Sequence, residues 1–312
     1  MTETSRSAHQ RAAITAALAN VREIASQSDR VIARAGFKHA EDLISFAHGM
    51  GCDDPPLQVS EGRLSGILTR LHIGDIELAY ETCNRDLIFE NSCDDLAACI
   101  HGLPGGDRFE LLGQPSLIAL PAWSRSVYLG VNGNGPACDP PMDFQPVNEG
   151  DFWAAMNRIV ETITLTADCP AREVEIVIDS ADLMVVINRF ATELTWFREE
   201  GESRRSRTLM RFLDLAQQRS SFRVSDLVED LNMTRRNLHY YATKHLGIAP
   251  KKLVKSMALR NAMCALPAAT ASGKSIADVA FEHGFESSPQ FSLDYRLLFG
   301  ERPSDTRRRH DI

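Results

Sequence analysis

The spacing of hydrophobic residues divides the chain into a β-rich front part and a helical end. Apolar residues recur at helical spacing within about residues 5–49, so we predict helices there. From about 57 to 132, short β-favouring runs alternate with clusters of Gly, Asn and Asp, which is typical of an antiparallel sandwich or small barrel. We expect strands within Gly66–Ile73, Ile76–Tyr80, Asp86–Phe89, Ser116–Leu120 and Ser126–Val131.

The middle of the chain predicts two helices and one strand. Residues 152–165 and 181–197 have helical spacing, 173–178 alternates like a strand, and 136–146 has the composition of a loop. The helix at 181–197 is apolar on much of its surface, so we expect it to link domains or to form a dimer surface. A polar stretch from Arg198 predicts a boundary between a front domain, 1–200, and a C-terminal domain, 203–312.

The C-terminal domain predicts two short helices joined by a tight turn at about 275–299. Ser275 is a good N-cap for the first helix, and Gly284 supplies the left-handed residue that ends it. Ser288 caps the second helix with Pro289 at its first position, and Gly300 ends it. Helices joined in this way predict a helix-turn-helix, whose second helix enters the major groove of DNA.

A second unit at about 224–245 repeats this plan. Ser225 would cap the first helix, Asn232 takes the left-handed turn, and Thr234 caps the second helix. Pro250 opens a long amphipathic helix that we expect to end at Pro267 and to hold the two units rigidly apart. On a duplex the two units should lie in successive major grooves, about 34 Å apart.

Charge is distributed unequally between the two domains. From Ser203 to Ile312 there are 19 Lys and Arg against 11 Asp and Glu, a net charge of +8. The remaining 15 basic and 31 acidic residues give −16, so the whole chain has a net charge of −8. A basic domain on an acidic body suits a polyanionic partner at one end only.

The C-terminal residues resemble the AraC/XylS family of bacterial regulators. The resemblance covers about Arg205 to Arg309 and is strongest in IADVAFEHGFESSPQFS, residues 276–292, followed by Tyr295 and by FGERPS, residues 299–304. It implies an α+β N-terminal sensor domain (a cupin-like β-sandwich or barrel plus helices) followed by an all-α double helix-turn-helix domain. It also implies an effector-responsive transcription activator that binds double-stranded DNA and RNA polymerase, acts as a homodimer and is no enzyme.

The geometry of the family places two sets of side chains against DNA. From the first recognition helix we expect Arg236, His239 and Tyr240 on bases, with Arg235 and Lys244 on phosphates. Family members usually carry Arg where Leu293 stands, and Asp294 is a poor neighbour for phosphate, so the second helix should read fewer bases. Its candidate contacts are Ser287, Ser288, Gln290, Ser292 and Arg296.

The front domain shows no legible catalytic or metal-binding motif. His72 and His101 stand alone, without a His-x-His pair and downstream carboxylate, so we expect no metal, no cofactor and no catalytic residue. Seven cysteines without Cys-x-x-Cys spacing favour reduced thiols. The chain begins with no signal-peptide pattern and contains no apolar run of membrane-spanning length, so we expect a cytoplasmic protein without membrane contact.

Four arginines crowd the start of the C-terminal domain: Arg204, Arg205, Arg207 and Arg211. Arginines at a helix N-terminus oppose the helix dipole, which favours an anion site at the hinge, although nearby glutamates or DNA phosphate could also neutralise them. Arg207-Thr-Leu-Met-Arg211 resembles the Arg-x-x-x-Arg element by which PilZ-type receptors hold cyclic di-GMP, but their Asp/Asn-x-Ser-x-x-Gly element is missing. The open alternatives are a small organic effector in the β-rich domain, a protein partner without any ligand, and a cupin-type enzyme fused to a DNA-binding domain.

Overall fold

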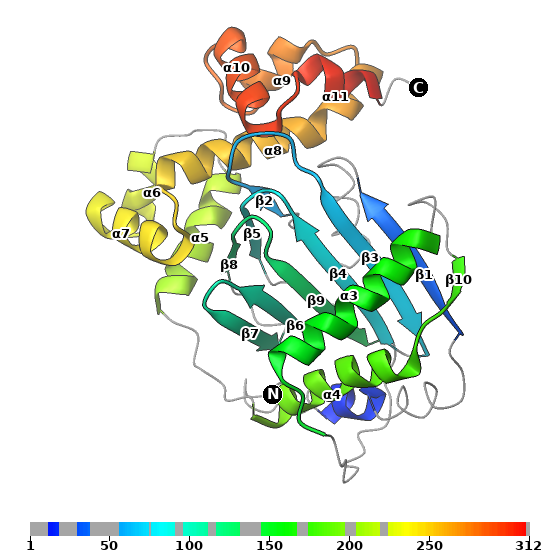
Figure 1. Cartoon of the computed structure of the whole chain (residues 1–312). Helices are drawn as coiled ribbons and strands as arrows, with labels where there is room; N and C mark the ends of the chain where they lie inside the picture. The colour runs from blue at the N-terminus through cyan, green and yellow to red at the C-terminus, as the bar shows by residue number, and fades with distance from the viewer. Residues whose placement is uncertain are drawn as a thin grey trace.

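The computed structural model describes residues 12–18, 30–37, 56–74, 76–90, 96–111, 117–131, 145–166, 174–196, 204–218 and 224–309. Within these ranges a β-rich front part is followed by a helical C-terminal part (Figure 1). The predicted domain boundary at 200–203 lies outside the described residues, so it stays a prediction. Of the predicted loop at 136–146, only residues 145 and 146 are described.

A seven-stranded antiparallel sheet forms the frame of the front part. Its strand order is β10-β1-β3-β4-β9-β6-β7, so the last strand of the domain pairs with the first. One face of this sheet is apolar and is covered by helices α3 and α4 (Figure 1). The elements are β1 (Arg30–Phe37), β3 (Gly66–Ile73), β4 (Ile76–Cys83), β6 (Leu96–Leu103), β7 (Gly106–Leu111), β9 (Arg125–Val131), α3 (Glu149–Thr166), β10 (Val174–Val177) and α4 (Ser180–Trp196).

The opposite face meets a small second sheet of β2 (Leu57–Gln58), β5 (Leu87–Glu90) and β8 (Leu117–Leu120). Leu68 of β3 and Cys83 of β4 pack with Leu87 and Ile118 of the small sheet. Side chains alternate along a strand, so Leu68 faces this sheet while Leu71 faces the helices. The described strands therefore form two facing open sheets, as the sandwich alternative predicts.

The helix prediction for residues 5–49 is wrong over part of its length. Residues 12–18 are helical, but Arg30–Phe37 form β1, which pairs with β3 on one side and β10 on the other. The apolar residues of this segment satisfy either periodicity, and strand pairing with partners far along the chain decides between them. Strands β6 and β7 are absent from the sequence prediction. The strands and helices predicted between 66 and 197 are otherwise present with small changes of boundary.

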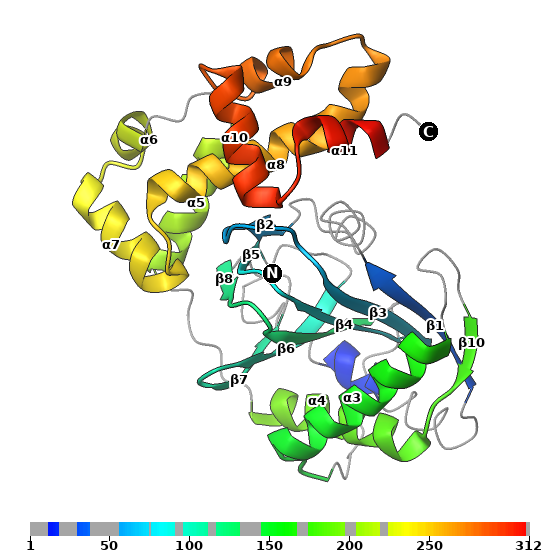
Figure 2. The same ribbon diagram turned by 45° about the horizontal axis from the view of Figure 1, so that its top comes forward.

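The described residues of the C-terminal part are helical (Figure 2). They enclose two separate hydrophobic cores, one for each half. The long helix α8 contributes to both: Leu253 and Met257 lie in the first core, and Leu259 and Leu266 lie in the second. None of the described helices is long and apolar enough to span a membrane. The helices are α5 (Arg204–Gln218), α6 (Val224–Asp230), α7 (Arg235–Leu246), α8 (Pro250–Ala271), α9 (Ile276–Glu282), α10 (Ser288–Phe299) and α11 (Pro303–Arg309).

Two helix ends differ from the prediction. Helix α8 continues through Pro267 to Ala271, because the alanines that follow the proline favour helix and Ala269 packs into the second core. Helix α6 begins at Val224, so Ser225 lies inside its first turn and is not its N-cap.

Candidate nucleic-acid interface

The first helix-turn-helix consists of α6 and α7. Asn232 has a φ of 49° at the turn between them, the left-handed conformation that the sequence predicts for it. The Thr234 hydroxyl then accepts a hydrogen bond from the Asn237 amide at 3.2 Å, which caps α7. Leu238 and Ala242 point into the first core, so the opposite face of α7 is left to solvent.

All five predicted contact residues of α7 are exposed: Arg235, Arg236, His239, Tyr240 and Lys244. Two of them contact each other, because the Lys244 ammonium donates to the Tyr240 hydroxyl at 3.1 Å and lies 5.5 Å from the ring centroid. This pairing holds a cation and an aromatic ring side by side on the exposed face. Arg235, Arg236 and His239 complete a basic surface on α7.

The second helix-turn-helix, α9 and α10, has stronger local signals. Ser275 and Asp278 form a capping box at the start of α9, and Gly284 takes the turn with a φ of 81°. The prediction for the α10 cap is wrong by one residue, since Ser287 is the N-cap and Ser288 the first helical residue. Pro289 still fits because the amides of the first turn have no acceptor within the helix.

The outer face of α10 carries fewer charges than that of α7. Ser287, Gln290, Leu293 and Arg296 are exposed, while Ser288 and Ser292 are half-buried. The prediction that Asp294 lies on this outer face, where its charge would disfavour phosphate, is wrong: its side chain is buried and accepts from the Lys255 ammonium at 2.6 Å. Lys255 belongs to α8, so an ion pair between two helices keeps this carboxylate buried.

A hollow of about 250 Å³ lies where α10 meets the start of α11. Two arginines from different elements, Arg296 and Arg302, line it together with Ser292, Ser304 and the apolar Ile276, Leu293 and Pro303. Guanidinium and hydroxyl donors around an open hollow suit a phosphate group. The hollow therefore favours Arg296, a predicted contact residue, as a ligand of the phosphate backbone.

Helix α8 spaces the two units. Its 22 residues correspond to a length of about 33 Å. Because it packs into both cores, the two recognition helices belong to one continuous helical framework (Figure 2).

The front domain contacts both helix-turn-helix units, which the sequence does not predict. Leu57, Val59 and Ile88 are part of the same hydrophobic core as α5, α6, α7 and α8. The loop after β2 reaches the end of α10, where the Gly62 amide donates to Leu297 O at 2.9 Å and the Gln58 amide donates to Leu298 O at 2.5 Å. We call this surface the interdomain contact. Its front-domain side is residues 57–63 and 88, and its C-terminal side is the first core of α5–α8 together with residues 297–298.

The predicted anion site at the hinge is only partly described. Arg204 is the first residue of α5, so the four arginines occupy its first two turns. The Arg211 side chain is exposed, whereas the side chains of Arg204, Arg205 and Arg207 lie outside the described residues. A ligand role for these four residues remains a prediction.

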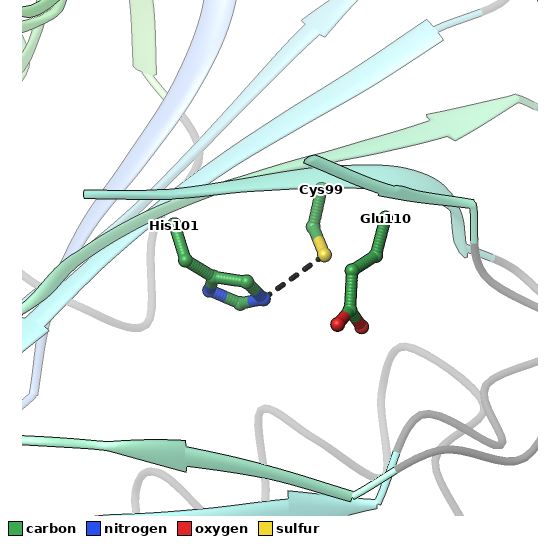
Figure 3. A group of neighbouring side chains, drawn as sticks. All are labelled: Cys99, His101 and Glu110. Atoms are coloured by element: carbon green, nitrogen blue, oxygen red, sulfur yellow. Dashed lines mark hydrogen bonds between the residues drawn. The ribbon is translucent and has the colours of Figure 1, made fainter. Parts of the chain in front are cut away.

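A buried polar group lies on the face of the large sheet that meets the small sheet. His101 Nε2 is 3.1 Å from Cys99 Sγ, and Glu110 lies beside them (Figure 3). Burial lowers the pKa of His101 to about 3, with a smaller contribution from the positive charge of Arg108. Burial likewise raises the pKa of Glu81, on the same face, to about 8, although Tyr128 donates to its carboxylate at 3.3 Å. His101, which stands alone in the sequence, therefore has Cys99 and Glu110 as neighbours in the fold.

Comparison with known proteins places the C-terminal region. A family model described as a helix-turn-helix domain matches residues 227–309. The XylDLEGF operon transcriptional activator 3 of Pseudomonas putida is 33% identical over 94 residues, which are 30% of this chain and 28% of that protein. A second activator of the same operon is 35% identical over 82 residues, 26% of each chain. These residues belong to the AraC/XylS family.

The chain spans little more than a quarter of the length of these two relatives. Both relatives are transcriptional activators. Among solved structures, apo ToxT of Vibrio cholerae aligns over 89% of this chain and 96% of its own with 11% identity and a TM-score of 0.33. The AraC-like transcriptional activator CuxR aligns at a TM-score of 0.21.

Proposed function

We propose that this protein is a sequence-specific DNA-binding transcription regulator that responds to an effector bound by its front domain. The single observation that carries the proposal is the pair of AraC/XylS-type helix-turn-helix units, both exposing their second helix and both packed on α8. Because both units pack on the single helix α8, we expect their recognition helices to enter successive major grooves, which lie about 34 Å apart.

We assign most of the sequence discrimination to α7. Arg236 is exposed on its outer face, and a guanidinium can bridge O6 and N7 of guanine. The Tyr240 and Lys244 pair adds an aromatic surface beside a cation, and Arg235 suits phosphate. On α10 the exposed Leu293 offers no donor, and Arg296 beside Arg302 at the hollow suits the backbone.

Electrophoretic mobility shifts on a native target promoter test this assignment. Arg236→Ala should weaken specific binding about 10- to 100-fold, since a bidentate arginine contributes about 1–3 kcal/mol of discrimination. Ser292→Ala, the matched change on α10, should weaken it far less. The reverse order would refute the assignment, and an unfolded variant is recognised by its circular dichroism spectrum.

We further propose that the effector binds the front domain and that the interdomain contact carries its signal. The default ligand is a small organic metabolite in the front domain. The alternative is an anion bound at the hinge by the arginines that begin α5, for which cyclic di-GMP is the candidate. Calorimetry with cyclic di-GMP on wild type, Arg207→Ala and the exposed control Lys251→Ala separates the two. No heat with wild type removes the nucleotide, and a metabolite panel in thermal-shift format then tests the default.

Activation would also require contact with RNA polymerase and, by the family resemblance, a homodimer. Sedimentation of the full chain with and without a promoter fragment measures the stoichiometry. If neither DNA affinity nor melting temperature changes across the metabolite panel, a protein partner docking on the front domain replaces the small-molecule effector in this proposal.

A further inference from the structure

Three potential metal ligands project from neighbouring strands at the edge of the large sheet. Cys99 and His101 are two residues apart on β6, so they share one face, and Glu110 on β7 is the direct pairing partner of Cys99. Figure 3 shows the three side chains on the same side of the strands, and their ligand atoms all lie within 4.8 Å of one another. Cys99 and His101 are fully buried, and Glu110 is 8% exposed.

We infer that Cys99, His101 and Glu110 bind a divalent transition-metal ion, for which Zn²⁺ is the best fit. Thiolate, imidazole and carboxylate are the three ligand types that protein zinc sites use. Binding forms one bond to each ligand, and the thiol proton of Cys99 leaves to solvent. The two anionic ligands then cancel the charge of the ion, which suits a buried position. This site is independent of the proposed DNA-binding function.

A fourth residue holds the histidine in position. His101 Nδ1 is 2.8 Å from the hydroxyl of Ser126, which is buried on β9 directly opposite His101. This bond leaves Nε2 directed at Cys99 Sγ, 3.1 Å away. With Nδ1–H donating to Ser126, the Nε2 lone pair would be available to the ion. Metal-binding histidines commonly donate their other ring nitrogen in this way.

The present geometry needs a small adjustment to close around an ion. In a tetrahedral zinc site with bonds of about 2.0–2.3 Å, ligand atoms lie about 3.5 Å apart. The sulfur and nitrogen atoms are already near this separation, so it is chiefly the carboxylate that must approach. The Glu110 carboxylate forms an ion pair with the Arg108 guanidinium at 2.5 Å. Because the Arg108 side chain is 53% exposed, it can move with the carboxylate toward the ion. Three protein ligands leave a fourth position for water or an exogenous ligand.

Cobalt titration of the full chain tests the site directly. Reduced protein stripped with chelator is titrated with Co²⁺ without oxygen, and the thiolate-to-cobalt absorption band in the near ultraviolet is measured. We expect about one equivalent per chain, displaced by Zn²⁺. Cys99→Ala should remove the band, whereas the matched changes Cys83→Ala, buried elsewhere, and Cys264→Ala, on the surface, should leave it unchanged.

Ser126→Ala keeps the test decisive if Cys99→Ala fails to fold, as judged by circular dichroism. It preserves all three ligands, so the band should persist while Co²⁺ affinity falls about 10- to 100-fold, the loss typical of removing such a supporting hydrogen bond. A protein that merely needs the Cys99–His101 contact for stability would show no band in any variant. No band in wild type, a band that survives Cys99→Ala, or unchanged affinity in Ser126→Ala would each overturn the proposal.

Discussion

Replacing Gln58 with Met should loosen the second helix-turn-helix from the front domain. Gln58 is 5% exposed, and its amide nitrogen lies 2.9 Å from Ser60 O, 2.7 Å from Gly62 O and 2.5 Å from Leu298 O. Methionine has a similar volume but no donor, so packing is kept while these hydrogen bonds are lost. Of the three hydrogen bonds made by Gln58, only the one to Leu298 O joins the two domains.

The expected cost follows from what each acceptor retains. Leu298 O also accepts from the Gly62 amide at 3.1 Å, so it is not left without a partner in the variant. A lost buried hydrogen bond whose acceptor keeps another donor contributes about 0.5–1.5 kcal/mol, and the two bonds within the loop add a fraction of that. We therefore expect the interdomain contact to lose about 1–2 kcal/mol, a factor of about 5–30 in its opening equilibrium.

Amide hydrogen exchange followed by NMR measures this opening. The Gly62 amide donates across the interdomain contact, so its exchange should accelerate about 5- to 30-fold in Gln58→Met. The Leu238 amide, which donates to Thr234 O at 3.0 Å inside the first helix-turn-helix, serves as an internal control and should keep its rate. Gln290→Met, exposed on α10, is the control variant. An unchanged Gly62 rate, or an equal acceleration at Leu238, would refute the reasoning.

Three further changes have expected outcomes. Burial raises the pKa of Glu81 to about 8 in the folded protein, above its value in the unfolded chain, so the folded state binds more protons. As pH rises from about 5 to 8, the free energy of unfolding should therefore fall by at most about 1.4 kcal/mol per pH unit. Thermal unfolding of Glu81→Gln should show a flatter pH profile, whereas the exposed control Glu161→Gln should not. Tyr295→Phe removes the hydroxyl that lies 2.7 Å from the buried Thr306 hydroxyl. The free energy of unfolding, measured in denaturant, should fall by about 1–2 kcal/mol, and an unchanged value would contradict a hydrogen bond at this site. Leu293→Arg, at a side chain 51% exposed, should strengthen DNA binding and steepen its salt dependence by about one charge, and an unchanged salt slope would place this position away from phosphate.

The helix-turn-helix units were predictable because their signals are local. Ser275, Gly284 and Gly300 each specify a cap or a left-handed turn through their own chemistry, and the structure places each where the sequence does. Helical spacing puts Asp294 on the same face as Phe291 and Leu298, but its charge favours an exposed position. The ion pair with Lys255 of another helix, which allows this carboxylate to be buried, is not visible in the sequence.

The front domain was harder because its structure depends on pairing between distant strands. Residues 30–37 become a strand through partners at 66–72 and 174–177. The candidate metal site was missed for the same reason. Cys99 and His101 are close in sequence, but Glu110 joins them only through the register of β6 with β7, and Ser126 only through β9. No spacing along the chain reveals such a group before the strands are paired.

The two helix-turn-helix units are attached to the front domain by different forces, which predicts how a signal would reach DNA. The first unit shares a hydrophobic core with Leu57, Val59 and Ile88, and burying each such side chain stabilises the contact by about 1.5–3 kcal/mol. The second unit is held at Leu297 and Leu298 by hydrogen bonds of about 0.5–1.5 kcal/mol each. A change within the front domain should therefore release α10 first while α7 stays attached. Because α7 is the helix to which we assign base reading, such a signal would alter the alignment of the second unit on the duplex more than it alters recognition of the first half-site.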